Sequence, residues 1–343
     1  MKDNFKVLIT DYAWSSLEPE RKVLVNAGSE IIVAETGDET ELLTYAPMVD
    51  GILTCWKPVR EPVIVAALQC QIIARYGIGL DNIDVDAATE NGIIVTNVPT
   101  YCVDEVSDHA MALILTCARK ITRYNKAVKS GIWDQNIGQK MYRLRGKTLG
   151  TVGIGSIAKS LIPKARAFGL IVNVYSPRTE SEVIKSHGAN KVTFDELLKT
   201  SDYISVHAPL TTETYHMFSM EEFRAMKPTA YLINTARGGI VDIEALFTAL
   251  QNKEIAGAGL DVLETEPPKQ NEKLLDLENI IMTPHAAFIS EESILELQVT
   301  AATCVAEVLS GKLPDTVVNP SVLNRSNLRL KKIGAIGQSH LPL

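Results

Sequence analysis

The chain has 343 residues, and at about 150 residues per domain this length predicts two domains. Hydrophobic residues make up 46% of it and charged residues 22%, an ordinary globular composition that excludes disordered, collagen-like and disulfide-scaffold chains. The 34 basic and 41 acidic residues give a net charge of −7 without a long basic run, so we expect neither nucleic acid nor an anionic membrane as a partner.

The sequence carries no signal for a membrane span, for secretion or for a metal. Its longest apolar stretch, around 110–115, is far shorter than the roughly 18 residues that a span needs. The N-terminus leads directly into the strand-like Lys6–Thr10 without an apolar targeting core. The 5 cysteines form no C-x-x-C pair, and neither they nor the histidines show metal-ligand spacing. We therefore expect reduced thiols, with Cys102 and Cys117 in the core, no metal and a cytoplasmic location.

In the N-terminal part of the chain, short apolar runs alternate with helix-length segments such as 16–27 and 62–68. The apolar runs predict buried parallel strands at 5–10, 30–34, 51–54, 71–74 and 92–95. The segment 103–121 then predicts a helix, because its apolar residues recur at helical spacing between an acidic first turn and a basic last turn. This order predicts a parallel α/β sheet.

A second α/β series starts near Lys147. Strands are expected at 147–152, 171–175, 203–206, 230–233, 257–260 and 280–282, followed by an amphipathic helix at 291–309. Residues 326–343 are expected to form a mobile tail. The predicted fold class is therefore α/β, built on parallel sheets.

The first turn of this second series has the pattern of a phosphate-binding loop. Gly153-Ile154-Gly155-Ser156-Ile157-Ala158 matches G-x-G-x-x-(G/A), follows a strand and opens a predicted helix at 156–168. The first glycine permits a tight turn, the second lets the backbone approach a pyrophosphate, and Ala158 allows close helix–strand packing. Pro163 lies inside this helix, where proline costs about 3 kcal/mol and is expected to kink or shorten it.

The end of the next strand bears on the choice of dinucleotide. NAD enzymes carry an acidic residue there to bind the ribose hydroxyls, whereas this chain has Ser176, followed by Pro177 and Arg178. Arg178 is able to donate hydrogen bonds to the 2′-phosphate of NADP, although Ser-Pro-Arg is also ordinary chemistry for an exposed turn. We expect NADP to be favoured over NAD.

An arginine, a glutamate and a histidine follow three later strands of the series. Arg237 lies in Asn234–Gly239, Glu266 follows Leu260-Asp261-Val262, and His285 lies in Thr283–Ala287. Ligands of open α/β sheets bind at the carboxyl ends of the strands, so these side chains are expected near one ligand. Arginine suits a carboxylate and a developing alkoxide, and histidine transfers protons near neutral pH. A glutamate bonded to that histidine orients it and favours its protonated form.

In this order the motifs resemble the D-isomer-specific 2-hydroxyacid dehydrogenase family. Besides the dinucleotide turn, the motifs that carry the resemblance are Tyr76-Gly77-Ile78-Gly79-Leu80-Asp81-Asn82-Ile83-Asp84, Thr-Ala-Arg-Gly-Gly, Leu-Asp-Val…Glu-Pro and Pro284-His285. The sequences 284–288, 290–293 and 311–315 are most similar to the branch of C-terminal-binding proteins and phosphoglycerate dehydrogenase. Phe288 stands where C-terminal-binding proteins carry a tryptophan.

The resemblance implies two Rossmann- or flavodoxin-like domains. The substrate domain would be discontinuous, made of 1–98 and 287–325, and the NAD(P)-binding domain 99–286 would be inserted into it, with substrate in a cleft between them. The family also implies a homodimer through the cofactor domain, with 132–145 as part of the arm. It implies reduction of a small 2-keto acid by NADPH or NADH to a D-2-hydroxy acid.

The same resemblance implies a role for each matched residue. His285 would be the general acid in reduction, Glu266 its partner, and Arg237 the ligand of the substrate carboxylate and carbonyl oxygen. The further substrate contacts would be Arg75, the backbone of Tyr76, Gly77 and Ile78, and Phe288. The cofactor would contact Gly153, Gly155, Ser156, Ile157, Ser176, Arg178, His207, Ala208, Pro209, Thr214, Thr235 and Ala236, and Asp261 would accept from its carboxamide.

Two alternatives stay open. A purely structural role is the alternative for each of these residues taken alone. His109, on the helix predicted at 103–121, is expected to be a packing histidine. A dinucleotide-sensing interaction protein of the corepressor type is the alternative function, because C-terminal-binding proteins keep the same three catalytic side chains.

Overall fold

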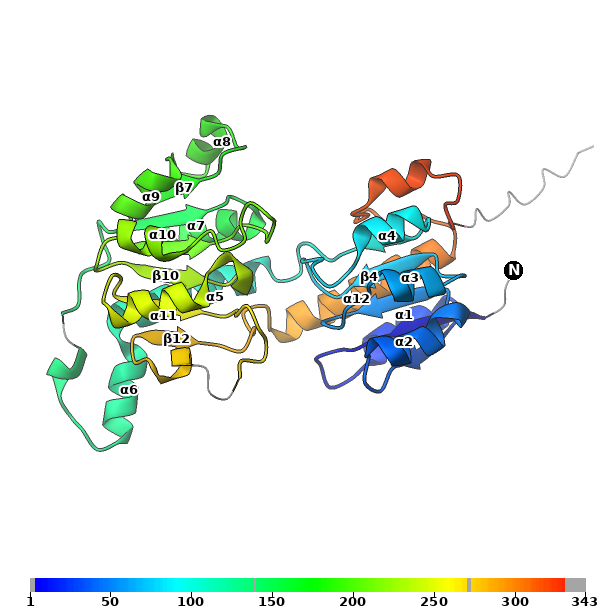
Figure 1. Cartoon of the computed structure of the whole chain (residues 1–343), viewed down its shortest axis with the longest axis horizontal. Coiled ribbons are helices and arrows are strands. Elements are labelled where there is room, and N and C mark those ends of the chain that lie inside the picture. Colours follow the sequence, from blue (N-terminus) through cyan, green and yellow to red (C-terminus); the bar gives the residue numbers. More distant parts are fainter. Residues whose placement is uncertain (1–3, 139, 270–272, 331–343) are drawn as a thin grey trace, which may run out of the picture. The chain divides into compact units, whose positions relative to one another are not determined.

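The computed structural model describes residues 4–138, 140–269 and 273–330. It divides into two compact units, Met1–Tyr101 with Ser290–Leu343 and Cys102–Ile289. Both units are built on parallel sheets, which confirms the predicted fold class. In Figure 1 the orange helix α12 (Glu291–Leu309) lies among the blue and cyan elements from the start of the chain, so the first unit is discontinuous.

The first unit contains a five-stranded sheet in the order β2-β1-β3-β4-β5. Its strands are β1 (Phe5–Ile9), β2 (Ser29–Val33), β3 (Gly51–Thr54), β4 (Ile72–Arg75) and β5 (Ile94–Thr96). Helices α1 (Glu18–Asn26) and α12 pack together on one side, while α2 (Glu39–Tyr45), α3 (Glu61–Ala66) and α4 (Val85–Glu90) enclose a separate core. The strand order is the flavodoxin-like order, with its switch between β1 and β3.

The C-terminal segment completes this unit through the buried Asn319. Its Oδ1 accepts from Val95 N at 2.8 Å, while its Nδ2 donates to Thr89 Oγ1 at 2.9 Å and to Ile93 O at 3.0 Å. Val318 N also donates to Val95 O at 2.9 Å. The segment is therefore bound to the edge strand β5, which explains why residues far apart in sequence form one core.

The predicted tail lies only partly in the described chain, because residues 331–343 are outside it. Within the described part, Asn327 Nδ2 donates to Glu90 O at 2.8 Å and Arg329 N donates to Gly92 O at 2.9 Å. Residues 327–329 are thus bonded to the first unit.

The second unit contains a seven-stranded sheet in the order β12-β11-β10-β9-β6-β7-β8, with every pairing parallel. Its strands are β6 (Thr148–Val152), β7 (Ile171–Tyr175), β8 (Asn190–Lys191), β9 (Tyr203–Val206), β10 (Tyr231–Asn234), β11 (Gly257–Leu260) and β12 (Ile280–Met282). This is the Rossmann order with one additional strand, and its switch point lies between β6 and β9.

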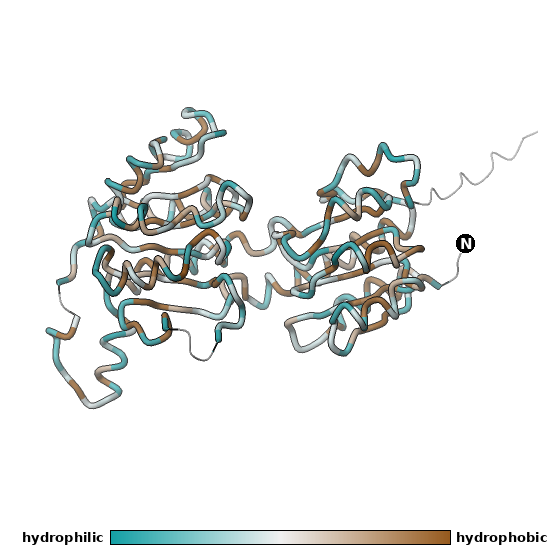
Figure 2. The backbone as a smooth tube through the Cα atoms, viewed as in Figure 1, coloured by the Kyte–Doolittle hydropathy of each residue, from teal (hydrophilic) through white to brown (hydrophobic). Residues whose placement is uncertain are grey.

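Helices cover both faces of this sheet. On one face α5 (Val103–Arg119) and α7 (Ser156–Ala167) share a core, and α9 (Phe194–Thr200), α10 (Met220–Ala225) and α11 (Ile243–Gln251) enclose another. The remaining elements of this unit are α6 (Ile121–Lys129), α8 (Ser181–Ser186), η2 (Gln135–Gly138), η3 (Gly238–Ile240) and η4 (Lys273–Asp276). The first unit also contains η1 (Ala46–Met48) and η5 (Pro320–Asn324). In Figure 2 brown, apolar segments recur through both units. A half-buried sheet would alternate, so the continuous apolar runs correctly indicated strands buried on both faces.

Two helices differ from their predictions. The helix predicted at 103–121 ends at Arg119, because Lys120 takes a left-handed conformation with φ +54°, and α6 starts at Ile121. Helix α7 continues through Pro163 to Ala167, so the proline does not shorten it. None of the helices in the described chain is long and apolar enough to cross a membrane.

Replacing Asn319 tests the discontinuous assembly of the first unit. Asn319→Ala leaves a buried backbone N–H and a buried carbonyl without their partner, and each such group costs about 1–3 kcal/mol. We expect the urea midpoint of the unfolding transition to fall by an amount equivalent to roughly 2–4 kcal/mol. Asn324→Ala, at an exposed position of η5, is the matched control, and an equal effect of the two substitutions would contradict the assignment.

Candidate active site

The site is set by the register of three neighbouring strands. Asn234 pairs with Leu260, and Leu260 pairs with Met282, so β10, β11 and β12 end level with one another. The segments that follow them carry Arg237, Glu266 and His285. Parallel pairing therefore brings residues that are distant in sequence to one edge of the sheet, as predicted from the sequence.

The turn that carries Arg237 is held by the last residue of β10. The buried Asn234 side chain donates from Nδ2 to Arg237 O at 2.9 Å and accepts from Ala236 N at 3.0 Å. Gly238 then lies against the backbone of the Leu263–Glu264 segment so closely that an added Cβ would be 1.9 Å from Leu263 C. Only glycine fits there, and this contact joins the Arg237 turn to the segment that leads to Glu266.

His285 and Glu266 form a hydrogen-bonded pair. Nδ1 of His285 lies 2.7 Å from Glu266 Oε2, and Leu263 N donates to Glu266 Oε1 at 2.8 Å. Burial raises the pKa of Glu266, but the hydrogen bond and charge of His285, the Leu263 N–H and the charge of Arg237 outweigh it, so this pKa is below its ordinary value. Glu266 is therefore ionised near neutral pH. Because the pair uses Nδ1, Nε2 is the nitrogen that could give a proton to a substrate.

A second carboxylate, Asp261, holds the loop that presents His285. Asp261 is 2% exposed, and its Oδ1 accepts from Thr283 Oγ1 at 2.5 Å and from Ala286 N at 2.9 Å. Its Oδ2 accepts from Ala287 N at 2.9 Å, and its backbone carbonyl accepts from His285 N at 2.8 Å. The loop folds around this carboxylate. The carboxamide contact predicted for Asp261 stays a prediction.

The same loop gives His285 an uncommon backbone conformation, with φ at +52°. Phe288, predicted as a substrate contact, lies against the histidine ring edge-to-face, with 6.3 Å between the ring centroids and 78° between the planes. Residues other than glycine rarely adopt a positive φ, so contacts of the loop must hold the His285 backbone in this conformation. These contacts thereby determine where its imidazole points.

The phosphate-binding turn has the geometry that a dinucleotide requires. Gly155 is the N-cap of α7 and no side chain caps that helix, so the N–H groups of its first turn are not used by a capping residue. An added Cβ on Gly155 would meet nothing within 4 Å, while one on Gly153, with φ +97°, would lie 2.8 Å from His207 O. The turn is thus open to a phosphate on one side and packed against the β9 end on the other. These residues fit a nicotinamide dinucleotide.

The other half of the switch point is the segment after β9, which contains His207, Ala208 and Pro209. His207 Nε2 lies 2.9 Å from Ser205 Oγ, and desolvation lowers the pKa of His207 to about 4, so this imidazole is neutral at pH 7. Thr214 donates from Oγ1 to Pro209 O at 2.6 Å and accepts from Thr211 N at 2.8 Å. Thr214 thereby closes the loop predicted to border the adenosine.

Ser176 and Arg178 follow β7, the strand next to β6. Gly153 N donates to Tyr175 O at 2.8 Å, so Ser176 lies directly beside the phosphate turn. The Ser176 hydroxyl is 2.8 Å from Thr179 Oγ1, and Arg178 is exposed, with its charge acting on Glu213. No carboxylate occupies position 176, as the sequence indicated.

Thr235, predicted at the nicotinamide end, has a buried hydroxyl without a hydrogen-bond partner in the described chain. Buried hydroxyls are normally bonded, so this atom is suited to a ligand group. Ala236, beside it, is half-buried.

The remaining predicted substrate contacts belong to the first unit. Arg75 is the last residue of β4, and Tyr76, Gly77 and Ile78 follow it. Arg75 is only 7% exposed: its guanidinium bonds to Tyr76 O and to Asn82 Oδ1, and it lies 5.6 Å from the centre of the Trp56 ring. In this structure Arg75 supports the loop at 76–78.

Sequence reasoning missed several residues that shape the site. Asn234 was seen only as part of a motif, and Thr283 was given no role, because neither residue type signals a loop contact. His109 was expected to be a packing histidine with its hydrogen bonding satisfied; its Nε2 lies 2.9 Å from Thr283 Oγ1, a partner that the sequence did not indicate. By contrast, Cys102 and Cys117 are buried, as predicted, and neither forms a disulfide in the described chain.

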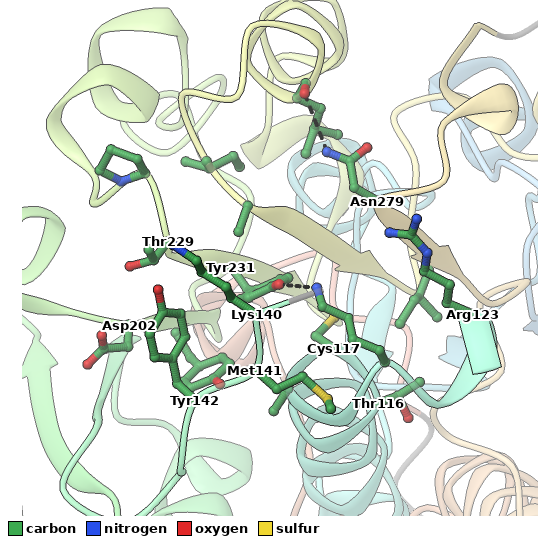
Figure 3. Close-up of a pocket in the computed structure, with 18 of the residues that line it drawn as sticks. Thr116, Cys117, Arg123, Lys140, Met141, Tyr142, Asp202, Thr229, Tyr231 and Asn279 are labelled. Atoms are coloured by element: carbon green, nitrogen blue, oxygen red, sulfur yellow. Dashed lines mark hydrogen bonds between the residues drawn. The ribbon is translucent and has the colours of Figure 1, made fainter. Parts of the chain in front are cut away.

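A cavity of about 700 Å³ lies elsewhere in the second unit (Figure 3). Its lining includes Tyr203 and Tyr231, which begin β9 and β10, and Asn279, which precedes β12. Amino ends of parallel strands lie at the edge opposite their carboxyl ends, so this cavity contains none of the predicted site residues. Among the described residues, no group of His, Cys, Asp and Glu is arranged to hold a metal ion.

Comparison with known proteins identifies the family. The family model described as D-isomer specific 2-hydroxyacid dehydrogenase, NAD binding domain, matches residues 111–287. A glyoxylate reductase of Thermococcus litoralis is 41% identical over 292 residues, covering 83% of this chain and 88% of that protein. A D-3-phosphoglycerate dehydrogenase of Methanocaldococcus jannaschii is 39% identical over 337 residues, covering 96% of this chain but 62% of that protein.

A solved structure agrees in fold along nearly the whole chain. The D-lactate dehydrogenase of Aquifex aeolicus, complexed with NAD and lactic acid, matches with a TM-score of 0.81 and 27% identity, covering 93% of this chain and 97% of that one. The strand order, the dinucleotide turn and the His285–Glu266 pair are consistent with these relatives. The chain therefore belongs to the D-isomer specific 2-hydroxyacid dehydrogenase family, as an NAD(P)-dependent oxidoreductase that interconverts 2-keto and D-2-hydroxy acids.

Proposed function

We propose that this enzyme reduces a small 2-keto acid of the glyoxylate type with NADPH, using Arg237, Glu266 and His285 as its catalytic residues. The observation that carries the proposal is the 2.7 Å pair of His285 Nδ1 and Glu266 Oε2, at a sheet edge where Arg237 acts electrostatically on the same carboxylate. An ionised glutamate, an oriented imidazole and a guanidinium are the groups that reduction of a carboxylate-bearing ketone needs.

Each group has one task in this mechanism. The nicotinamide cofactor supplies the hydride when it is bound. His285 donates a proton from Nε2 to the substrate carbonyl oxygen in reduction and accepts it in the reverse direction. Glu266 stabilises the protonated imidazole and orients it through Nδ1. Arg237 binds the substrate carboxylate and stabilises negative charge developing on the carbonyl oxygen.

The comparisons support a small keto acid. The relative from Thermococcus litoralis, whose length the chain covers almost completely, is named a glyoxylate reductase. The phosphoglycerate dehydrogenase relative is much longer, and the chain spans 62% of it. We therefore propose glyoxylate as the first substrate to assay, followed by hydroxypyruvate, pyruvate and a branched 2-keto acid.

Residues Arg75, Tyr76, Gly77, Ile78 and Phe288 remain proposed substrate-binding residues. Backbone N–H groups at 76–78 would bind the carboxylate. The bonds of Arg75 to Tyr76 O and Asn82 support an indirect part for its side chain, through the shape of that loop.

The preference for NADPH rests on Ser176 and Arg178. A carboxylate at position 176 would repel a 2′-phosphate, and this chain has a serine there. Arg178 is exposed, so its guanidinium is accessible to a phosphate. The A. aeolicus structure contains NAD, and we therefore propose a preference for NADPH rather than exclusion of NADH.

We further propose a homodimer through the second unit and a cytoplasmic location. Trp133 is 90% exposed and Ile132 51% exposed, within the 132–145 arm predicted from the family resemblance. Exposed aromatic and apolar groups of this kind are typical of an interface. None of the 5 cysteines forms a disulfide within the described residues, which supports a reducing compartment.

The alternative of a dinucleotide-sensing interaction protein gains no support. The relatives and the solved structure described above are named as enzymes.

Replacing His285 tests the proposed chemistry. His285→Ala removes the proton donor, and we expect kcat for glyoxylate reduction to fall by roughly a hundredfold or more, with little change in the Kd for NADPH. Initial rates come from NADPH absorbance and the Kd from fluorescence titration. His187→Ala, at the C-terminal end of α8, is the matched control. Turnover near that of the wild type in His285→Ala would refute the role of His285.

Replacing Ser176 tests the cofactor preference. In Ser176→Asp the new carboxylate repels the 2′-phosphate and accepts from the ribose hydroxyls of NADH. We expect the ratio of kcat/KM with NADPH to that with NADH to fall by roughly 10- to 100-fold, the effect of about one charge-assisted hydrogen bond. Lys185→Ala, which removes an exposed cation from α8, should leave the ratio unchanged. A wild type that prefers NADH would contradict the proposal.

Replacing Trp133 tests the dimer. Trp133→Ser removes the most exposed aromatic side chain of the arm, and burial of tryptophan often dominates an interface. We expect sedimentation velocity to show a wild-type dimer at micromolar concentration and at least a tenfold weaker association in the variant. The substitution Trp56→Ser, at an exposed position of the first unit, is the control. A monomeric wild type would exclude the homodimer.

A further inference from the structure

The loop from Thr283 to Ala287 depends on one carboxylate for its shape. Asp261 binds it through Thr283 Oγ1, Ala286 N and Ala287 N, at 2.5, 2.9 and 2.9 Å. His285 lies in the middle of these contacts, with its own N–H donated to Asp261 O. The direction of the imidazole therefore depends on the hydrogen bonds of Asp261 and Thr283.

His109, on helix α5, reaches this network from outside the loop. Its Nε2 is 2.9 Å from Thr283 Oγ1 and 3.7 Å from Asp261 Oδ1. The first distance is that of a hydrogen bond and the second is too long for one. His109 thus contacts the carboxylate through the Thr283 hydroxyl.

The proton positions follow from the donor inventory of these three groups. Asp261 Oδ1 is an acceptor, so the 2.5 Å contact uses the single hydroxyl proton of Thr283. Thr283 Oγ1 must then accept from His109, which places a proton on His109 Nε2. The chain of donors runs from His109 to Thr283 to Asp261. A donor to the hydroxyl oxygen polarises the O–H bond and strengthens its hydrogen bond to the carboxylate.

The network also joins the two ends of the second unit. The chain enters this unit at Cys102 and leaves it at Ile289. His109 lies on α5, which starts at Val103, and Thr283 begins the loop that leads to Ile289. The hydrogen bond between them therefore ties the entering helix to the departing loop beside His285.

We propose that His109 is a positioning residue for His285, acting through the Thr283 hydroxyl on Asp261. The inference rests on the proposed role of His285. His109 does not touch the His285–Glu266 pair in any described hydrogen bond, so its effect passes through the loop.

A positioning role affects the chemical step more than substrate binding. Proton donation occurs in the transition state, so a displaced imidazole lowers kcat while KM stays nearly constant. A purely structural role would lower the melting temperature and leave kcat of the folded enzyme unchanged. The two kinetic parameters therefore distinguish the two roles.

The test compares variants at both ends of the hydrogen bond. His109→Leu and Thr283→Val each break it, and we expect a roughly tenfold fall in kcat for glyoxylate with KM changed less than about threefold. Thr283→Ser keeps the hydroxyl and His109→Gln keeps an N–H donor, so both should retain most of the activity. His187→Leu and His187→Gln are matched controls, since His187 is in the same unit but outside this network.

A double-variant cycle decides whether His109 acts through Thr283. If it does, His109→Leu combined with Thr283→Val should lose about as much kcat as either change alone, rather than the product of both. Multiplicative losses, or unchanged kcat in the folded His109→Leu variant, would overturn the proposal. If His109→Leu does not fold by circular dichroism, Thr283→Val alone gives the test, because it leaves His109 in place and removes both bonds; unchanged kcat then overturns it.

Failure of the positioning role of His109 can be distinguished from failure of the proposed role of His285. If His285→Ala retains turnover, the proposed mechanism fails. If His285→Ala is inactive while His109→Leu keeps the wild-type kcat, only the positioning role of His109 fails.

Discussion

The level carboxyl ends of three parallel strands are the constraint on which this site depends. Asn234, Leu260 and Met282 share one row of the sheet, so the segments after β10, β11 and β12 leave it side by side. None of the three side chains proposed as catalytic is close to another in sequence. Their proximity follows from strand pairing, and pairing follows from apolar runs that are buried on both faces. A slip of one residue in any of these strands would displace the proposed catalytic side chain that follows it.

Specific hydrogen bonds and one close backbone contact then fix the shape of the segments that follow these strands. Asn234 closes the turn of Arg237, Gly238 lets that turn approach Leu263, and Leu263 N binds Glu266. The contacts of Asn234 and Leu263 each close one segment, the contact of Gly238 with Leu263 joins the two segments, and the apolar core that contains Ile240 and Leu260 lies against them. A site built in this way is preorganised by hydrogen bonds, which restricts the imidazole before any substrate arrives.

Much of this arrangement could be predicted from the sequence, for identifiable reasons. Strands such as Ile171–Tyr175 and Gly257–Leu260 were predicted with their observed bounds because short, largely uncharged stretches between turn residues leave few alternatives. The short β8 was missed, since Asn190–Lys191 has no apolar signal. The break at Lys120 was missed because a left-handed lysine has no compositional signature. Arg237, Glu266 and His285 came from motifs, whereas His109 and Thr283 depend on distances that only folding creates.

The two carboxylates of the site show how environment divides tasks between similar groups. Asp261 is buried, and both of its oxygens accept from the 283–287 loop. Glu266 is about one-third exposed, binds Leu263 N through one oxygen and turns the other to His285. Exchanging them would fail in both places, because a longer side chain at 261 would distort the loop and a shorter one at 266 would not reach the imidazole. Asp261 therefore holds the loop that carries His285, and Glu266 bonds the imidazole itself at Nδ1.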